Sequence, residues 1–166
     1  MMAMRNARKS TRKAGRNALL VLGMHRSGTS SLARVFSLLG ASLPVNVMPA
    51  NYGNEAGYWE PERVVALNDQ ILEFFGVAWD DPFAAKQLPP TNAFPARFTT
   101  QACQIITEEY PDSDLFVLKD PRCTLLRGFW LEVLASLHIH ASQVVVARPF
   151  AEVADSLLRR DATSAA

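Results

Sequence analysis

Cysteine is scarce in this chain of 166 residues, which holds only Cys103 and Cys123. The sequence has no Cys-x-x-Cys pair and no spacing typical of cysteine metal ligands. A disulfide framework and a structural zinc site are therefore not expected, and this cysteine usage suits a reducing compartment. We expect both cysteines to be small buried side chains rather than a disulfide or a nucleophile.

Long apolar runs are also missing. The longest one near the N-terminus, residues 18–22, is too short to cross a bilayer and has no small-residue cleavage site after it. We therefore expect a cytoplasmic protein with no transmembrane segment and no signal peptide. A hydrophobic fraction of 49% and a charged fraction of 20% are ordinary for a globular domain with a sizeable core.

Acidic residues are absent from positions 1–17, which carry six basic residues. The rest of the chain has a net negative charge, although the whole chain is at +1. Such a tail can contact nucleic acid or anionic lipid, but no aromatic residue separates the charges, so a solvated, disordered tail is favoured and no specific nucleic-acid partner is predicted. The predicted organisation is a basic disordered tail (1–17), one α/β domain (18–161) and a disordered end (162–166).

Short apolar segments alternate with amphipathic ones along the domain. Strands are predicted at 18–22, 115–118 and 143–147. Helices are predicted after Gly28, from Pro61 to Gly76, from Pro95 to about Tyr110, over 124–137 and from Pro149, with an irregular connection at 77–95. The first helix places Leu32, Val35, Phe36 and Leu39 on one stripe and ends at Gly40. This alternation predicts an α/β fold of three layers, with a mostly parallel sheet flanked by helices.

Polar clusters follow all three predicted strands, and each contains a cation. The clusters are His25-Arg26-Ser27, Lys119-Asp120 and Arg148. Parallel strands place their carboxyl ends at one edge of the sheet, where ligands bind. Three cationic strand ends at one edge predict a site for a polyanion.

The first cluster lies in a glycine-bounded loop. Gly23 and Gly28 have the glycine spacing of a phosphate-binding loop, and the hydroxyls of Ser27, Thr29 and Ser30 surround the second glycine. The sequence thus predicts a nucleotide-binding architecture like that of P-loop proteins; a tight turn with a serine cap is the alternative. Thr29 stands where such a loop has its lysine, and Arg26 is the cation inside the turn, which favours an anion transferase over an ATP-hydrolysing enzyme.

Two of these elements together resemble a known family. Residues 26–30 read Arg-Ser-Gly-Thr-Ser, and Arg148, at a strand end, has Ser156 eight residues later in the next helix. This order resembles the sulfotransferases that use 3′-phosphoadenosine 5′-phosphosulfate (PAPS), and the likeness extends from about residue 19 to 161. The segments Gly-Tyr-Trp-Glu at 57–60 and Lys-Asp-Pro-Arg at 119–122 resemble the bacterial branch of that family.

The resemblance implies PAPS as co-substrate and a role for each matched residue. The donor would be bound by residues 26–30 together with Arg148 and Ser156. Arg26 and Lys119 would be cations at the sulfuryl group, and Glu60 would be the general base, although Glu60 also suits a first-turn acid and Lys119 a solvated strand end. No metal is predicted, since no metal-binding residue types cluster.

The sequence leaves several alternatives open. A small-molecule or nucleoside kinase would use Asp120 for Mg²⁺ but lacks the loop lysine, and a non-catalytic nucleotide-binding remnant is the third reading. Tyr58 and Trp59 either line an acceptor pocket or belong to the core, and Arg122 either binds an acidic acceptor or holds Asp120 in place. The resemblance implies a small-molecule, carbohydrate or lipid acceptor, and no feature indicates an oligomeric state.

The resemblance also implies a missing end. Members of the family carry a later Gly- and basic-rich segment over the adenosine, and nothing after Asp161 resembles it. We therefore expect a fold that is incomplete at its C-terminal end, and a chain that binds the donor weakly and turns over slowly.

Overall fold

The computed structural model describes residues 15–50, 57–81 and 83–164. In chain order the elements are β1 (Asn17–Leu22), α1 (Thr29–Leu38), α2 (Glu62–Phe74), α3 (Ala84–Gln87), the 3-10 helix η1 (Thr91–Ala93), α4 (Ala96–Glu109), β2 (Leu115–Lys119), the 3-10 helix η2 (Pro121–Thr124), α5 (Arg127–Ser136), β3 (His140–Val145) and α6 (Phe150–Ser164). Strands and helices alternate as the sequence predicts.

The three strands form one parallel sheet with β1 in the centre, β2 on one side and β3 on the other. Leu20 lies opposite Leu118 of β2 and Gln143 of β3. Parallel neighbours need crossover connections, and helices supply them here: α1, α2 and α4 lie between β1 and β2, and α5 lies between β2 and β3. The predicted α/β class, with a parallel sheet flanked by helices, is confirmed.

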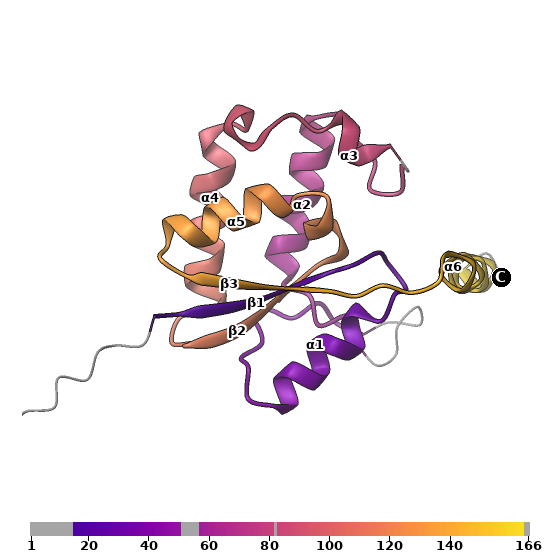
Figure 1. The fold of residues 1–166 in the computed structure, drawn as a ribbon, viewed down its shortest axis with the longest axis horizontal. Coiled ribbons are helices and arrows are strands. Elements are labelled where there is room, and N and C mark those ends of the chain that lie inside the picture. The colour runs from indigo at the N-terminus through magenta and orange to yellow at the C-terminus, as the bar shows by residue number, and fades with distance from the viewer. Residues whose placement is uncertain (1–14, 51–56, 82, 165–166) are drawn as a thin grey trace, which may run out of the picture.

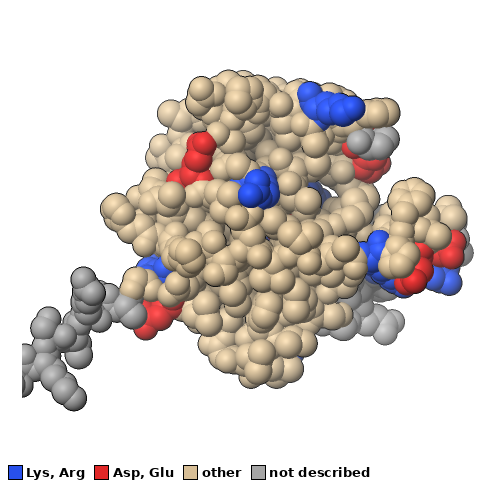
Figure 2. All heavy atoms as spheres, in the orientation of Figure 1, with Lys and Arg blue, Asp and Glu red and all other residues tan. Residues whose placement is uncertain are grey.

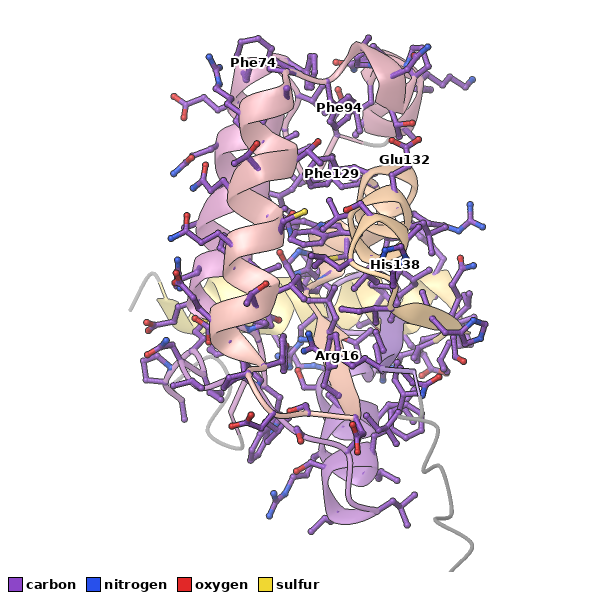
Figure 3. All side chains as sticks on the ribbon, turned by 90° about the vertical axis from the view of Figure 1, so that its left-hand side faces the viewer. Arg16, Phe74, Phe94, Phe129, Glu132 and His138 are labelled. Atoms are coloured by element: carbon purple, nitrogen blue, oxygen red, sulfur yellow. The ribbon has the colours of Figure 1, made fainter. Side chains whose placement is uncertain are left out.

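Helices cover both faces of the sheet (Figure 1). Successive side chains of β1 point to opposite faces, and because both sets are apolar, each face needs a covering layer. Leu20 joins the larger core, which contains buried residues of α2, α4 and α5. Val21 joins a smaller core with Ala33 of α1. In the larger core the rings of Phe94 and Phe129 stack with their centroids 5.5 Å apart (Figure 3). With both faces covered, the carboxyl edge of the sheet is the place left for a site.

The third strand is placed differently from the prediction. It was expected at 143–147, where three valines follow one another, but β3 spans His140–Val145. The reason is its pairing with β1: His140–Val145 lies in register with Asn17–Leu22, and β1 ends where the chain turns at Gly23. Contacts with the central strand, rather than the valine run, set the ends of β3.

Two further predictions are corrected in the helical layer. The connection at 77–95, expected to be irregular, contains α3 and η1. The stripe predicted for α1 is only half covered, since Leu32 and Phe36 pack on the smaller core whereas Val35 is 48% and Leu39 77% exposed. The small side chain of Ala33 is the one that α1 buries fully against the sheet, so the buried face of this helix is narrow.

The helices and strands that the structure describes begin at residue 17 and end at residue 164. β1 begins at Asn17, and the guanidinium of Arg16 donates hydrogen bonds to the carbonyl oxygens of Tyr110 and Ser113, so both residues belong to the fold. At the other end, α6 continues to Ser164. Residues 1–14 of the predicted tail, and residues 165–166 of the predicted end, lie outside the described residues. Among the helices described, none has the length and apolar character needed to cross a membrane.

Candidate functional site

The loop between β1 and α1 has a shape that depends on glycine. Gly23 has φ of 155°, and a Cβ there would lie 2.7 Å from the carbonyl oxygen of Val146. Gly28, the residue before α1, has φ of 102°. Arg26 lies in the left-handed region as well, with φ of 64°. A non-glycine residue in this conformation costs free energy, and such residues are concentrated at functional sites, so this loop is a candidate ligand loop.

The hydroxyl groups around the loop divide into two kinds. Ser27 is buried, and both its Oγ and its backbone N–H donate to the carbonyl oxygen of Met24, at 2.6 and 3.2 Å. Ser27 therefore shapes the turn, whereas the sequence predicts that it contacts a donor. Thr29 and Ser30 instead begin α1 at the cavity. No described side chain caps this end of α1, so its first N–H groups are available to an anion.

Thr124 anchors the start of the loop. The backbone N–H of Gly23 donates to Thr124 Oγ1 at 2.8 Å, and Thr124 Oγ1 donates to the carbonyl oxygen of Gly23 at 3.2 Å. Sequence reasoning missed this residue, because Thr124 is 101 positions from Gly23 and no motif links them. η2, which follows β2, thus holds the loop that follows β1.

Lys119 and Glu60 form a buried ion pair next to the loop. Lys119 ends β2 and is 1% exposed; Glu60 precedes α2 and is 4% exposed. The Nζ of Lys119 donates to Glu60 Oε1, to Ser30 Oγ at 3.1 Å and to the carbonyl oxygen of Tyr58 at 3.1 Å. These three bonds use all three protons of an ammonium group, so Lys119 joins α1, the segment before α2 and the end of β2 at one point.

Opposing influences act on the Glu60 carboxyl. Burial raises the pKa of Glu60, the Lys119 ammonium lowers it, and the negative charge of Asp120 raises it again. The net result is a pKa above the ordinary value of a glutamate. A carboxyl tuned in this direction is a better proton acceptor near neutral pH than an exposed one.

The backbone around Glu60 is held from two sides. The carbonyl oxygen of Glu60 accepts a hydrogen bond from the N–H of Met48 at 2.7 Å. Trp59, just before it, has φ of 58°, and its ring packs in the smaller core beneath the guanidinium of Arg34, 4.7 Å from the ring centroid. Of the two aromatic residues considered for an acceptor pocket, Tyr58 lines the cavity and Trp59, which is partly buried, packs against the smaller core.

Arg148 and Ser156 reach the same loop from the other side of the sheet. Arg26 Nε donates to Ser156 Oγ at 2.9 Å, and Arg148 Nη1 donates to the carbonyl oxygen of Arg26 at 3.1 Å. Arg148 Nε also pairs with Glu152 at 2.8 Å. Residues that follow β1 and β3 are therefore in direct contact. Figure 2 shows charged side chains gathered on the side where α6 lies.

A cavity of about 260 Å³ lies where these groups meet. It brings together the residues predicted from the three strand ends, apart from Ser27 and Asp120. Its walls are formed by His25, Arg26, Gly28, Thr29, Ser30, Ser31, Tyr58, Glu60, Lys119, Pro121, Arg148 and Ser156. Three basic side chains and one carboxyl line it, so the cavity suits an anionic ligand.

Two neighbouring residues are turned away from this cavity. Arg122 pairs with Asp120 at 3.0 Å and with Asp69 at 2.6 Å. Of the two roles considered for Arg122, the structure therefore favours holding Asp120 in place over binding an acidic acceptor. Cys123 is fully buried, and burial raises the pKa of its thiol well above the ordinary value. It is therefore a protonated core residue, as the sequence predicts, and not a nucleophile.

Within the part of the chain that the structure describes, His, Cys, Asp and Glu side chains form no group of three or more that could hold a metal ion. Comparisons with protein-family models, with curated proteins and with solved structures found no match. A functional assignment for this chain therefore rests on the geometry of the cavity and on the chemistry of its residues.

Proposed function

We propose that this chain is a sulfotransferase, which binds PAPS and transfers its sulfuryl group to a hydroxyl or amine acceptor. One observation carries the proposal: Arg26, Lys119 and Arg148, which come from three different strand ends, line a single cavity together with one buried carboxyl. Three cations suit a ligand with negative charge at more than one place. The carboxyl beside them suits a reaction in which a proton must be removed.

The two sides of the cavity suit the two charged ends of the donor. The free amino end of α1, with the hydroxyls of Thr29 and Ser30, would hold the 5′-phosphosulfate, as in a P-loop-like architecture. Arg148 and Ser156 would hold the 3′-phosphate. Support comes from the contact between Arg26 and Ser156 at 2.9 Å, which brings the side chains of the two sides together.

In this mechanism the protein forms no covalent bond to the substrate during sulfuryl transfer. The acceptor oxygen attacks sulfur, a new S–O bond forms, and the S–O bond to the 5′-phosphate breaks, so that adenosine 3′,5′-bisphosphate leaves with the extra negative charge. The carboxylate of Glu60 takes the acceptor's proton. Arg26 and Lys119 stabilise the charge that develops on the leaving oxygen, as cations do in phosphoryl transfer.

Lys119 has a second role in this proposal. Its contact with Glu60 opposes the effect of burial, because an ammonium lowers the pKa of a neighbouring carboxyl. The bond to Ser30 places the same ammonium at the amino end of α1, where the phosphosulfate would bind. One lysine thus links the base to the donor.

A kinase is the weaker interpretation of the same residues. Thr29 stands in place of the loop lysine. Asp120, the residue that a kinase would use for Mg²⁺, has one carboxylate oxygen bonded to Asn68 and the other to Arg122. Its side chain is fully buried, so the oxygens that a metal would need are already engaged.

Isothermal titration calorimetry tests the proposal. The purified chain is titrated with adenosine 3′,5′-bisphosphate and, separately, with ATP and Mg²⁺. We expect preference for the bisphosphate and a loss of roughly 10- to 100-fold in affinity in Arg148→Ala, the range for one charged hydrogen bond. Arg97→Ala is the matched control, since Arg97 lies in α4 and stacks on Phe98 rather than on the cavity.

The other outcomes discriminate between the alternatives. Binding of ATP with Mg²⁺, without binding of the bisphosphate, would favour a kinase and contradict the proposal. Binding of the bisphosphate without transfer of labelled sulfur from PAPS to any hydroxyl or amine acceptor would favour a non-catalytic nucleotide-binding protein. An equal loss of affinity in the Arg97 variant would show that the effect of Arg148 is not specific.

A further inference from the structure

A buried polar cluster lies beside the cavity but takes no part in the mechanism above. Asp120, Asn68 and Trp130 are each fully buried, although all three carry polar atoms. Trp130 Nε1 donates to Asn68 Oδ1 at 2.9 Å, and Asn68 Nδ2 donates to Asp120 Oδ2 at 2.6 Å. Burial of a polar group costs free energy unless the group is paired, so the bonds among these three side chains are needed for the fold to tolerate them.

The directions of these hydrogen bonds require a carboxylate at position 120. An indole N–H only donates, so Trp130 turns the amide oxygen of Asn68 toward itself and the amide nitrogen toward Asp120. The other carboxylate oxygen, Oδ1, accepts from Arg122 Nη1 at 3.0 Å and from the backbone N–H of Arg122 at 3.2 Å. Both oxygens of Asp120 therefore accept, which an asparagine amide cannot do.

This cluster joins the elements that carry the ion pair of the cavity. Asn68 belongs to α2, and Glu60 lies just before that helix. Asp120 directly follows Lys119 at the end of β2. Arg122 adds a second link, because its guanidinium also pairs with Asp69 of α2 at 2.6 Å. The distance between the Glu60 and Lys119 side chains thus depends on how Asp120 holds α2 against the strand.

We propose that Asp120 is a positioning residue for Glu60: through Asn68 and Arg122 it fixes α2 against the end of β2, and its carboxylate supplies a negative charge beside the base. The catalytic meaning of this inference rests on the proposed sulfotransferase function. The positioning itself does not, because it concerns contacts inside the free protein.

The charged groups around Glu60 come from several elements. Lys119 ends β2, while Asp120 and Arg122 lie at η2, and they act in different directions on the Glu60 pKa: the ammonium and the guanidinium lower it and the Asp120 carboxylate raises it. Arg26 and Arg148 line the same cavity. Removal of Asp120 and removal of Arg122 should therefore shift the titration of Glu60 in opposite directions.

Carbon-13 NMR of the glutamate side-chain carboxyls follows Glu60 directly, with its resonance assigned by Glu60→Gln. We expect Asp120→Asn to lower the titration midpoint of Glu60, and Arg122→Gln to raise it. Glu73→Gln is the matched control, since Glu73 is an exposed acid of the same helix outside this cluster, and it should leave the midpoint unchanged. General loosening of the fold would instead shift the Glu60 midpoint in the same direction in both test variants, toward the midpoint of an exposed glutamate.

Opposite shifts support the inference; an unchanged midpoint in both test variants, or shifts in one direction, would overturn it. If Asp120→Asn does not fold, Arg122→Gln decides alone, and a midpoint that fails to rise counts against the inference. In the transfer assay we expect Asp120→Asn to lower kcat on the order of 10- to 100-fold, the scale of a small misplacement, with unchanged affinity for adenosine 3′,5′-bisphosphate. Absence of bisphosphate binding in the unaltered protein would instead count against the sulfotransferase proposal alone.

Discussion

Replacing Lys119 with methionine removes the ammonium and keeps a side chain of similar length at a position that is 1% exposed. Glu60, at 4% exposed, then keeps a carboxylate without its counter-charge. Breaking a buried ion pair by removal of one partner costs about 3–5 kcal/mol. Each kcal/mol lowers the thermal midpoint of a domain of this size by about 2–4 °C, so we expect a fall of roughly 6–20 °C at neutral pH.

This loss of stability should depend on pH in a defined direction. Without Lys119 the pKa of Glu60, already raised by burial, rises further, because the ammonium opposes that rise. A carboxyl whose folded-state pKa exceeds its unfolded value favours the fold below the unfolded pKa, and this contribution is lost as pH rises through the folded pKa. The penalty of Lys119→Met is therefore largest at neutral pH and shrinks as Glu60 becomes protonated in acid.

Urea unfolding, followed by circular dichroism at neutral and at acidic pH, measures this effect. The set comprises Lys119→Met, Glu60→Gln, the double variant and Lys86→Met, a control at an exposed lysine of α3. A double-mutant cycle then isolates the coupling between Lys119 and Glu60. An equal loss at both pH values, or a double variant that loses the sum of the two single losses, would refute the reasoning.

Three further outcomes follow from single contacts. Gly23→Ala places a Cβ 2.7 Å from the Val146 carbonyl oxygen, so we expect it to lose about 1–3 kcal/mol of stability and to bind adenosine 3′,5′-bisphosphate more weakly; unchanged affinity in calorimetry would contradict the role of the loop. Trp130→Phe leaves the amide oxygen of Asn68 unpaired in the core, which should cost about 1–3 kcal/mol in urea unfolding, and a neutral effect would count against that bond. The transfer rate should fall in acid with a midpoint above the ordinary glutamate pKa, because burial raises the pKa of Glu60, and Glu60→Gln should abolish this limb; a limb that survives points to another base.

Local rules were enough to predict the layout of the site. The apolar run at residues 18–22, followed by Gly23, has the pattern of a buried parallel strand that enters a loop, and parallel strands bring their carboxyl ends to one edge. That rule predicted that Arg26, Lys119 and Arg148 would meet, and they line one cavity. It needs only the order of the elements, which short-range patterns supply.

Contacts between distant residues could not be predicted in the same way. Asn68 and Asp120 are 52 positions apart, and Thr124 is 101 positions from Gly23. Nothing in the composition or spacing indicates which polar side chain will meet which across the fold. The same limit applies to Ser27, whose hydroxyl suits a ligand by motif but is taken by the carbonyl oxygen of a neighbouring turn residue.

The central claim is that one cavity holds a ligand with phosphate groups at both its 3′ and its 5′ positions. The most direct measurement compares, by calorimetry, adenosine 3′,5′-bisphosphate with adenosine 5′-phosphate, which lacks only the 3′-phosphate, in the unaltered chain and in Arg148→Ala. We predict tighter binding of the bisphosphate by the unaltered chain, and loss of this difference in the variant, because Arg148 and the nearby Ser156 would bind the 3′-phosphate. Equal affinity of the unaltered chain for the two nucleotides would contradict the account.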